Sequence, residues 1–165
     1  MPEQFDVLIV DANIVDGTGR VAFKGSIGIR GERITAIGDL KGDAARKIDA
    51  EGLVACPGFI DPHSHGDTEI LQYPLAENLV MQGITTILGG QCGHSAAPTK
   101  EVSFGKFLTR VERTRTSLNF SCLVGFGAVR EAVMGEDFKR KARTDEIEEM
   151  KKYVEETMRS GAFGI

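Results

Sequence analysis

Apolar residues in the first third of the chain fall into short clusters rich in β-branched side chains. The clusters lie at residues 7–10, 14–15, 27–29 and 34–37, and they are separated by turn-forming sequences at 16–19 and 30–33. Such clusters between tight turns predict short strands. We therefore expect residues 1–57 to form a small antiparallel β domain, which ends at Pro57 and Gly58.

From Gly58 onward the pattern changes to alternating strands and helices. Apolar runs predict strands over residues 59–63, 84–88 and 119–124, and helical spacing predicts helices over 75–82, 103–115 and 145–159. In the last helix Asp145 and Glu148 resemble a capping box. The apolar segment 162–165 then predicts the start of a fourth strand.

Repeated strand–helix units of this size predict parallel strands joined by right-handed crossovers. A closed barrel of eight units needs about 250 residues, whereas this chain has 165. The predicted fold class is therefore α/β, with a small N-terminal β-sheet domain followed, over residues 58–165, by the first three to four βα units of an incomplete TIM-type barrel. Because such a barrel leaves strand edges uncovered, we expect the isolated chain to fold poorly.

Candidate chemistry is concentrated at the ends of the first two barrel strands. His63 and His65 are two residues apart at the end of the first, so their side chains are expected on the same side. Cys92 follows the second strand, and the carboxyl ends of parallel barrel strands meet at one mouth. Two imidazoles and a thiolate suit Zn2+, which lowers the pKa of its bound water to about 7. Asp61 lies one pleat deeper and is expected to orient a ligand or to pack.

Each of these residues also has a simpler interpretation. Two histidines at this spacing are often incidental, although their place at a strand end favours a ligand pair. Cys92 is about equally well explained as a small buried residue, but its glycine-rich loop permits close approach to a site. We expect Cys56 and Cys122 to lie in the core and His94 to lie on a surface loop.

Composition narrows the possible partners. The chain is 41% hydrophobic and 27% charged with a net charge of -4, which is typical of a globular protein and argues against a nucleic-acid surface. The short basic segment 139–143 is expected to be a solvated loop. No apolar run approaches the roughly 18 residues of a membrane span, no signal-peptide pattern is recognised, and three widely spaced cysteines do not predict a disulfide framework. These features predict a cytoplasmic protein.

Several motifs together resemble those of a known family. Residues 16–19 and 57–65 resemble the opening of the amidohydrolase superfamily, and residues 91–95, with sequence QCGHS, are similar to a motif of its N-acyl-D-amino-acid deacylases, or D-aminoacylases. Further similarity lies in residues 77–78, 82–86, 123–125, 130–135 and 160–164. The resemblance covers essentially the whole chain.

The resemblance implies roles for the candidate residues. His63 and His65 would ligate metal, and Cys92 would replace the carboxylated lysine that bridges two metals in related enzymes. The remaining ligand histidines, the catalytic aspartate that acts as general base and an arginine for the substrate carboxylate would lie beyond Ile165. Two residues depart from the family pattern: Gln91 stands in place of asparagine, and Phe126 stands where histidine is common.

The function predicted from these motifs is that of the N-terminal part of a zinc-dependent amidohydrolase. It would hydrolyse the amide bond of small-molecule N-acyl-D-amino acids through metal-activated water. One alternative is a cyclic-amide hydrolase of the hydantoinase or dihydroorotase type, and another is a non-catalytic, truncated metal-binding remnant. The isolated chain is expected to be inactive, and no nucleic-acid or membrane partner is predicted. The acyl group, the side chain, the number of metals and the oligomeric state stay open.

Overall fold

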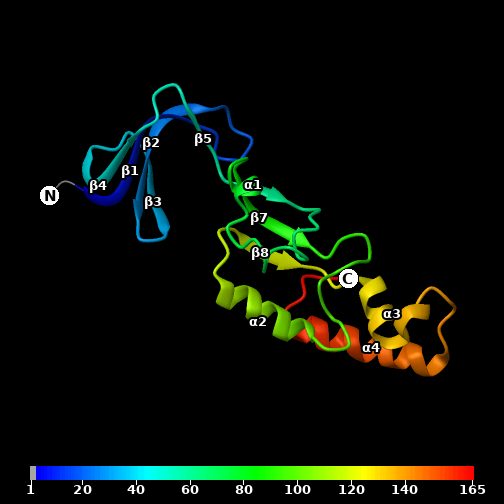
Figure 1. Ribbon diagram of the computed structural model, residues 1–165. Coiled ribbons are helices and arrows are strands. Elements are labelled where there is room, and N and C mark those ends of the chain that lie inside the picture. The colour runs from blue at the N-terminus through cyan, green and yellow to red at the C-terminus, as the bar shows by residue number, and fades with distance from the viewer. Residues whose placement is uncertain (1–2) are drawn as a thin grey trace. The chain divides into compact units, whose positions relative to one another are not determined.

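The computed structural model describes residues 3–165, and the chain divides into two compact units (Figure 1). One unit ends at Pro57, and the other runs from Gly58 to Ile165. Secondary structure in the first is all strand, whereas the second combines strands and helices. The fold class is therefore mixed α/β, as the sequence predicts.

The first unit is a five-stranded sheet of mixed direction. Its strands are β1 (Glu3–Ile14), β2 (Phe23–Arg30), β3 (Arg33–Gly38), β4 (Gly42–Asp49) and β5 (Val54–Ala55). The main order is β3-β2-β1-β4, and β5 also pairs with β1. Neighbours β1, β2 and β3 are antiparallel, but β4 and β5 both run parallel to β1. The prediction of a purely antiparallel sheet is therefore wrong.

Strand β1 joins two apolar clusters that the sequence pattern separates. Its pairing with β2 shifts register between Ile9 and Ala12, where Asp11 has a φ of 59°. A bulge of this kind bends a strand without ending it. Ala12 and Ile14 beyond the bulge pack with Ile27 of β2 in a small buried core.

The second unit contains a parallel sheet of three strands with helices between them. The strands are β6 (Phe59–Asp61), β7 (Ile84–Gly89) and β8 (Asn119–Cys122), in the order β6-β7-β8. The helices are α1 (Glu77–Val80), α2 (Phe104–Thr114), α3 (Phe126–Met134) and α4 (Thr144–Arg159), with a short 3-10 turn at Gly135–Asp137. Both strand pairs are parallel, which confirms the predicted direction.

Local signals explain both ends of α2 and the start of α4. The Ser103 side chain accepts a hydrogen bond from the Lys106 N–H at the start of α2, and Arg115 ends that helix in the left-handed conformation. The predicted capping box of α4 is displaced by two residues, because the Glu146 carboxylate, rather than that of Glu148, accepts from the Arg143 N–H. Helix α1 is shorter than predicted, and α3 is not predicted at all.

The end of the chain follows β8 without forming a continuous strand. Phe163 N donates to Cys122 O at 2.9 Å, and Val124 N donates to Gly164 O at 2.8 Å. Two isolated backbone hydrogen bonds do not make a regular ladder, so the predicted fourth strand over 162–165 is not formed as a strand.

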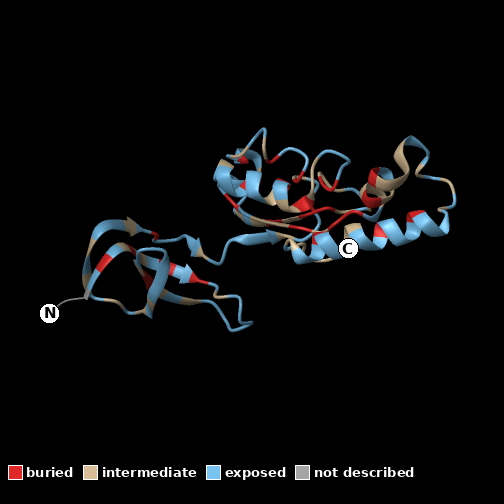
Figure 2. Ribbon diagram, turned by 90° about the horizontal axis from the view of Figure 1, so that it is seen from below, coloured by how far each residue is buried: buried red, intermediate tan, exposed pale blue. Residues whose placement is uncertain are grey.

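The core of the second unit lies between the sheet and its helices (Figure 2). Ile87 of β7, Phe104 of α2 and Val129 of α3 are among its fully buried side chains. Burial of these large apolar groups fixes the sheet against its helical layer. Among the helices of residues 3–165, none has both the length and the apolar character that a membrane crossing requires.

Candidate metal centre

The two histidines follow the end of β6. The strand stops at Asp61, two residues earlier than predicted, but the chain stays beside β7 because Ser64 N donates to Leu88 O at 3.0 Å. Ser64 is buried, while His63 and His65 on either side of it are exposed. The two imidazole rings lie 5.8 Å apart between centroids. They therefore project on the same side of the segment.

Cys92 comes from the loop after β7 and meets this histidine pair. Its Sγ atom lies 3.3 Å from Nε2 of His63. Side-chain donor atoms of His63, His65 and Cys92 all lie within 4.8 Å of one another, and all three residues are exposed. Cys92 has a φ of 56°, which is uncommon for a residue other than glycine.

Asp67 binds the backbone of the Cys92 loop through two hydrogen bonds. The sequence pattern does not single this residue out. The side chain is only 2% exposed. Its Oδ1 atom accepts a hydrogen bond from Gly90 N at 3.2 Å, and its Oδ2 atom accepts from Ala96 N at 2.7 Å. The only signal for it in the sequence is weak: an acidic residue lies two positions after the second histidine.

Gln91 ties the same loop to the two strands. Its Nε2 group donates to the carbonyl oxygen of Pro62 at 3.0 Å and to that of Leu88 at 3.2 Å. Pro62 directly precedes His63, so this amide links the histidine segment to the cysteine loop. The residue that departs from the family motif thus has a definite structural role.

The start of α3 packs closely against residues 93–95 of the Cys92 loop. Gly125 N donates to the Ser95 hydroxyl at 2.9 Å, and Ala128 N donates to Gly93 O at 3.3 Å. A Cβ atom on Gly125 would lie 2.5 Å from the carbonyl carbon of His94, and one on Gly127 would lie 2.7 Å from Gly93 O. Both glycines are therefore needed for the close approach of helix and loop.

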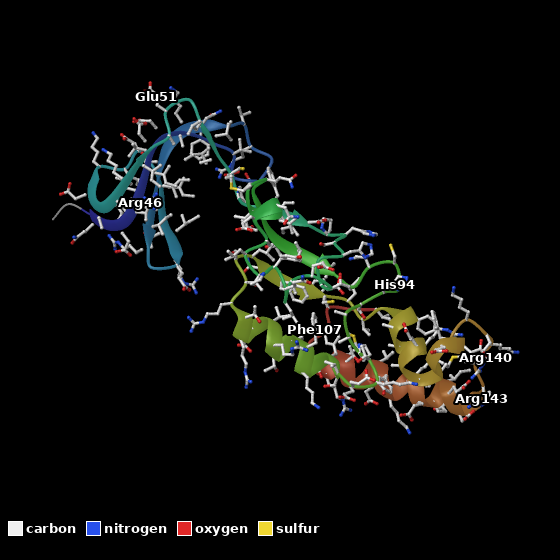
Figure 3. The ribbon with its side chains drawn as sticks, in the orientation of Figure 1. Arg46, Glu51, His94, Phe107, Arg140 and Arg143 are labelled. Atoms are coloured by element: carbon white, nitrogen blue, oxygen red, sulfur yellow. The ribbon has the colours of Figure 1, made fainter. Side chains whose placement is uncertain are left out.

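The other sequence-predicted residues lie outside the cluster. Asp61 is half-buried, and its carboxylate accepts from the backbone N–H of His63 at 3.2 Å. His94 is exposed in the loop after β7, as expected (Figure 3). Cys122 is buried, and burial together with the Asp67 carboxylate raises the pKa of its thiol to about 12. Cys56 is exposed, so its predicted core position is wrong: it lies beyond the end of β5, where no strand pairing encloses it.

The donor set and its spacing fit a zinc ion. Ligand atoms around tetrahedral zinc are separated by about 3.5 Å, given bond lengths of about 2.0 to 2.3 Å. The three donors lie within 4.8 Å of one another, so only small side-chain movements would be needed. Two imidazole nitrogens with one thiolate match the borderline softness of zinc. Three donors also leave at least one coordination position of a tetrahedral zinc for a further ligand.

The basic segment near α4 is engaged within the protein. Glu146 is buried and forms ion pairs with Arg140 and Arg143, the two arginines labelled in Figure 3. Arg143 also pairs with Asp145. Hydrogen bonds from Arg140 and from the Arg143 backbone lower the pKa of Glu146 from 4.5 to about 2. These arginines thus stabilise the start of α4, a more specific role than that of the predicted solvated loop.

Comparison with known proteins relates this geometry to a family. A model described as the amidohydrolase family matches residues 46–165. The chain is 36% identical to a D-aminoacylase of Alcaligenes xylosoxydans xylosoxydans over 99% of its own length and 37% of that protein. It is also 36% identical to an N-acyl-D-aspartate deacylase of the same organism, covering 99% of this chain and 36% of the other.

A solved structure extends the comparison to three dimensions. The N-acyl-D-glutamate deacylase of Bordetella bronchiseptica, complexed with zinc and a phosphonate inhibitor, is 30% identical and has a TM-score of 0.90, with 98% of this chain and 38% of the other covered. The chain thus spans little more than a third of the length of these relatives. Because the family model matches most of its residues, the chain belongs to the amidohydrolase family.

Proposed function

We propose that this chain is the N-terminal part of a zinc-dependent amidohydrolase that cleaves the amide bond of N-acyl-D-amino acids. The observation that carries the proposal is the convergence of His63, His65 and Cys92 within 4.8 Å at the ends of two neighbouring parallel strands. Relatives named for deacylation of N-acyl-D-amino acids, 36% identical over 99% of the chain, support the reaction and the substrate class.

The three donors of this chain would hold the metal from one side of the active site. Zinc, when bound, supplies a Lewis acid and makes water available as a nucleophile near neutral pH. His63 and His65 would contribute neutral imidazoles, and Cys92 would contribute a thiolate after losing its proton. We propose that the general base and the remaining ligands come from residues outside this chain, which spans 37% of the D-aminoacylase.

The substrate class is proposed at the level of the N-acyl-D-amino acid. The two Alcaligenes relatives have the same identity to this chain, although one is named for D-aspartate derivatives and the other is a D-aminoacylase. Overall similarity therefore does not favour one amino-acid side chain. The acyl amide and the D configuration are the features that these substrates would share.

The fold supports a two-domain arrangement within the proposed enzyme. The chain divides after Pro57 into an all-strand unit and a unit of parallel strands with helices. We propose that residues 1–57 form a small β domain and that residues 58–165 form the first portion of a TIM-type barrel. A cytoplasmic location is also proposed, because Cys56, Cys92 and Cys122 are free thiols, which persist in reducing compartments.

The test is a direct assay of the full-length gene product. Purified protein is depleted of metal with a chelator, reloaded with zinc, and incubated with N-acetyl-D-amino acids, their L enantiomers and hydantoins. Zinc-dependent release of free D-amino acid is expected, with little activity on the L series. Turnover of hydantoins alone would favour the cyclic-amide alternative, and no turnover of any substrate by zinc-loaded protein would overturn the proposal.

A further inference from the structure

Asp67 is a buried carboxylate that spans the two ends of the Cys92 loop. Its oxygens accept hydrogen bonds from Gly90 N and Ala96 N, which lie on opposite sides of Cys92 in the sequence. Asp67 itself follows His65 by two residues. The same short segment therefore presents a histidine to the cluster and fastens the loop that presents the cysteine.

The surroundings of Asp67 leave it little freedom to move. A buried charge is tolerated only where hydrogen bonds replace its lost hydration, and here each oxygen has a backbone N–H donor. Gly89 provides the space, because a Cβ atom there would lie 2.8 Å from the Asp67 Cβ atom. The Asp67 carboxylate is thus enclosed by the protein, with one backbone N–H donor for each oxygen.

Cys92 needs an external support of this kind. Its φ of 56° belongs to the left-handed region, which side chains with a Cβ atom rarely occupy. Such a conformation persists when the surrounding structure fixes it. With residues 90 and 96 both fastened to Asp67, the short connection between them has few conformations, and the observed one brings Sγ to 3.3 Å from His63 Nε2.

We propose that Asp67 is a positioning residue for the metal centre. It holds the loop of residues 90–96 so that the Cys92 thiolate stays within coordinating distance of the metal that His63 and His65 bind. Its own two oxygens are occupied by backbone donors, so it acts through Cys92 rather than as a ligand. This inference rests on the proposed metal site.

The experiment is done on the full-length gene product with cobalt in place of zinc. Cobalt is used because its absorption spectrum reports which side chains coordinate it. Ligand-field bands in the visible measure bound Co2+, and a thiolate-to-cobalt charge-transfer band in the near ultraviolet measures coordination by Cys92. The variant is Asp67→Asn, which places an amide N–H2 group against one of the two backbone N–H donors. The matched control is Glu69→Gln, an exposed acidic residue two positions further along the same segment.

In Asp67→Asn we expect the charge-transfer band to weaken relative to the cobalt bound, while ligand-field bands from histidine coordination remain. Cobalt affinity is expected to fall about 10- to 100-fold, the range for partners that orient ligands. Glu69→Gln should behave as the wild type. Circular dichroism verifies folding, and if Asp67→Asn does not fold, Asp67→Glu gives the same comparison with the charge kept but displaced by one methylene.

The outcomes separate this inference from the proposed function. In one outcome the wild type shows the thiolate charge-transfer band, and the folded Asp67 variant shows it at the same intensity per bound cobalt. That result would overturn the positioning role of Asp67 but not the metal centre. A wild-type protein that binds Co2+ without a thiolate band, or does not bind it, would overturn the metal centre and with it this inference.

Discussion

The Nε2 atom of His63 and the Sγ atom of Cys92 lie 3.3 Å apart, although 29 residues separate them in the sequence. One belongs to the segment after β6 and the other to the loop after β7, and these strands are parallel neighbours. Imidazole nitrogen and thiolate sulfur are both zinc ligands. One metal ion could therefore contact both residues with little movement of either side chain.

Replacement of Cys92 by alanine should remove one of three proposed ligands. We expect Cys92→Ala to lower zinc affinity by at least about 100-fold, more than the loss of an outer partner produces. Isothermal titration with a competing chelator measures the change. Cys56→Ala is the matched control, because Cys56 is an exposed thiol that lies outside the cluster; equal metal binding by the two variants would exclude Cys92 as a ligand.

Acid should destabilise the start of α4 through Glu146. The pKa of this carboxyl is lowered from 4.5 to about 2. A lowered pKa in the folded state means that the ionised form stabilises the fold above pH 4.5, and that this contribution is lost as the pH falls towards 2. Thermal midpoints of wild type and Glu146→Gln should thus converge over that interval.

The control for this pH effect is Glu148→Gln. Glu148 is exposed on the same helix and pairs with Lys151 at 2.7 Å. Because exposed ion pairs contribute little, its removal should leave the acid profile unchanged. The pH range to be measured extends about 2 units on either side of the ordinary carboxyl pKa of about 4. If the difference in thermal midpoint between wild type and Glu146→Gln stays constant over that range, Glu146 is not the source of the acid sensitivity.

Gly90 should tolerate no side chain. Its φ is 76°, and a Cβ atom would overlap the carbonyl group of Leu123. Gly83 in the same unit has a φ of 82°, but a Cβ atom there would meet Phe59 at an acceptable 3.4 Å. Gly83→Ala should cost about 1–2 kcal/mol from backbone strain alone, whereas Gly90→Ala should cost clearly more or prevent folding. Chemical denaturation measures the free energy of unfolding of both variants. Equal losses would show that the loop moves away from the Leu123 carbonyl at little cost.

Phe107 should be a major contributor to the core of the second unit. The Phe107 ring (labelled in Figure 3) lies in edge contact with Phe120 at 5.9 Å between centroids and near Phe104 at 6.4 Å. Phe107→Ala should reduce the free energy of unfolding by about 3–5 kcal/mol. Phe107→Leu, which retains most of the volume, should lose less than about 1.5 kcal/mol. Similar losses of unfolding free energy for the two variants would indicate that the core rearranges to fill the cavity left by alanine.

The parallel sheet and the metal cluster were predictable from sequence because each follows from a simple rule. The segments predicted as strands, 59–63, 84–88 and 119–124, overlap β6, β7 and β8. Parallel neighbours bring residues at their carboxyl ends together. His63, His65 and Cys92 needed no more than that placement. Their geometry in the structure agrees with the expectation, while their role as ligands stays a prediction.

The supports of the cluster were not predictable because they depend on tertiary contacts. Asp67 reads as an ordinary polar residue in a turn, and only the fold buries it against Gly90 and Ala96. Helix α3 has Gly125 as its N-cap residue and contains Gly127, although glycine is a poor helix former. Both glycines are explained by contact with the Cys92 loop, which no local pattern reveals.

Strand β4 also escaped prediction, and for a reason that bears on solubility. Among the described residues it pairs with β1 alone, so it forms one edge of its sheet. Arg46, labelled in Figure 3, and its neighbour Lys47 are both exposed on this edge strand. Charged side chains on an edge strand oppose pairing with a strand of another molecule. The polarity that conceals β4 in the sequence therefore protects the small sheet from edge-to-edge aggregation.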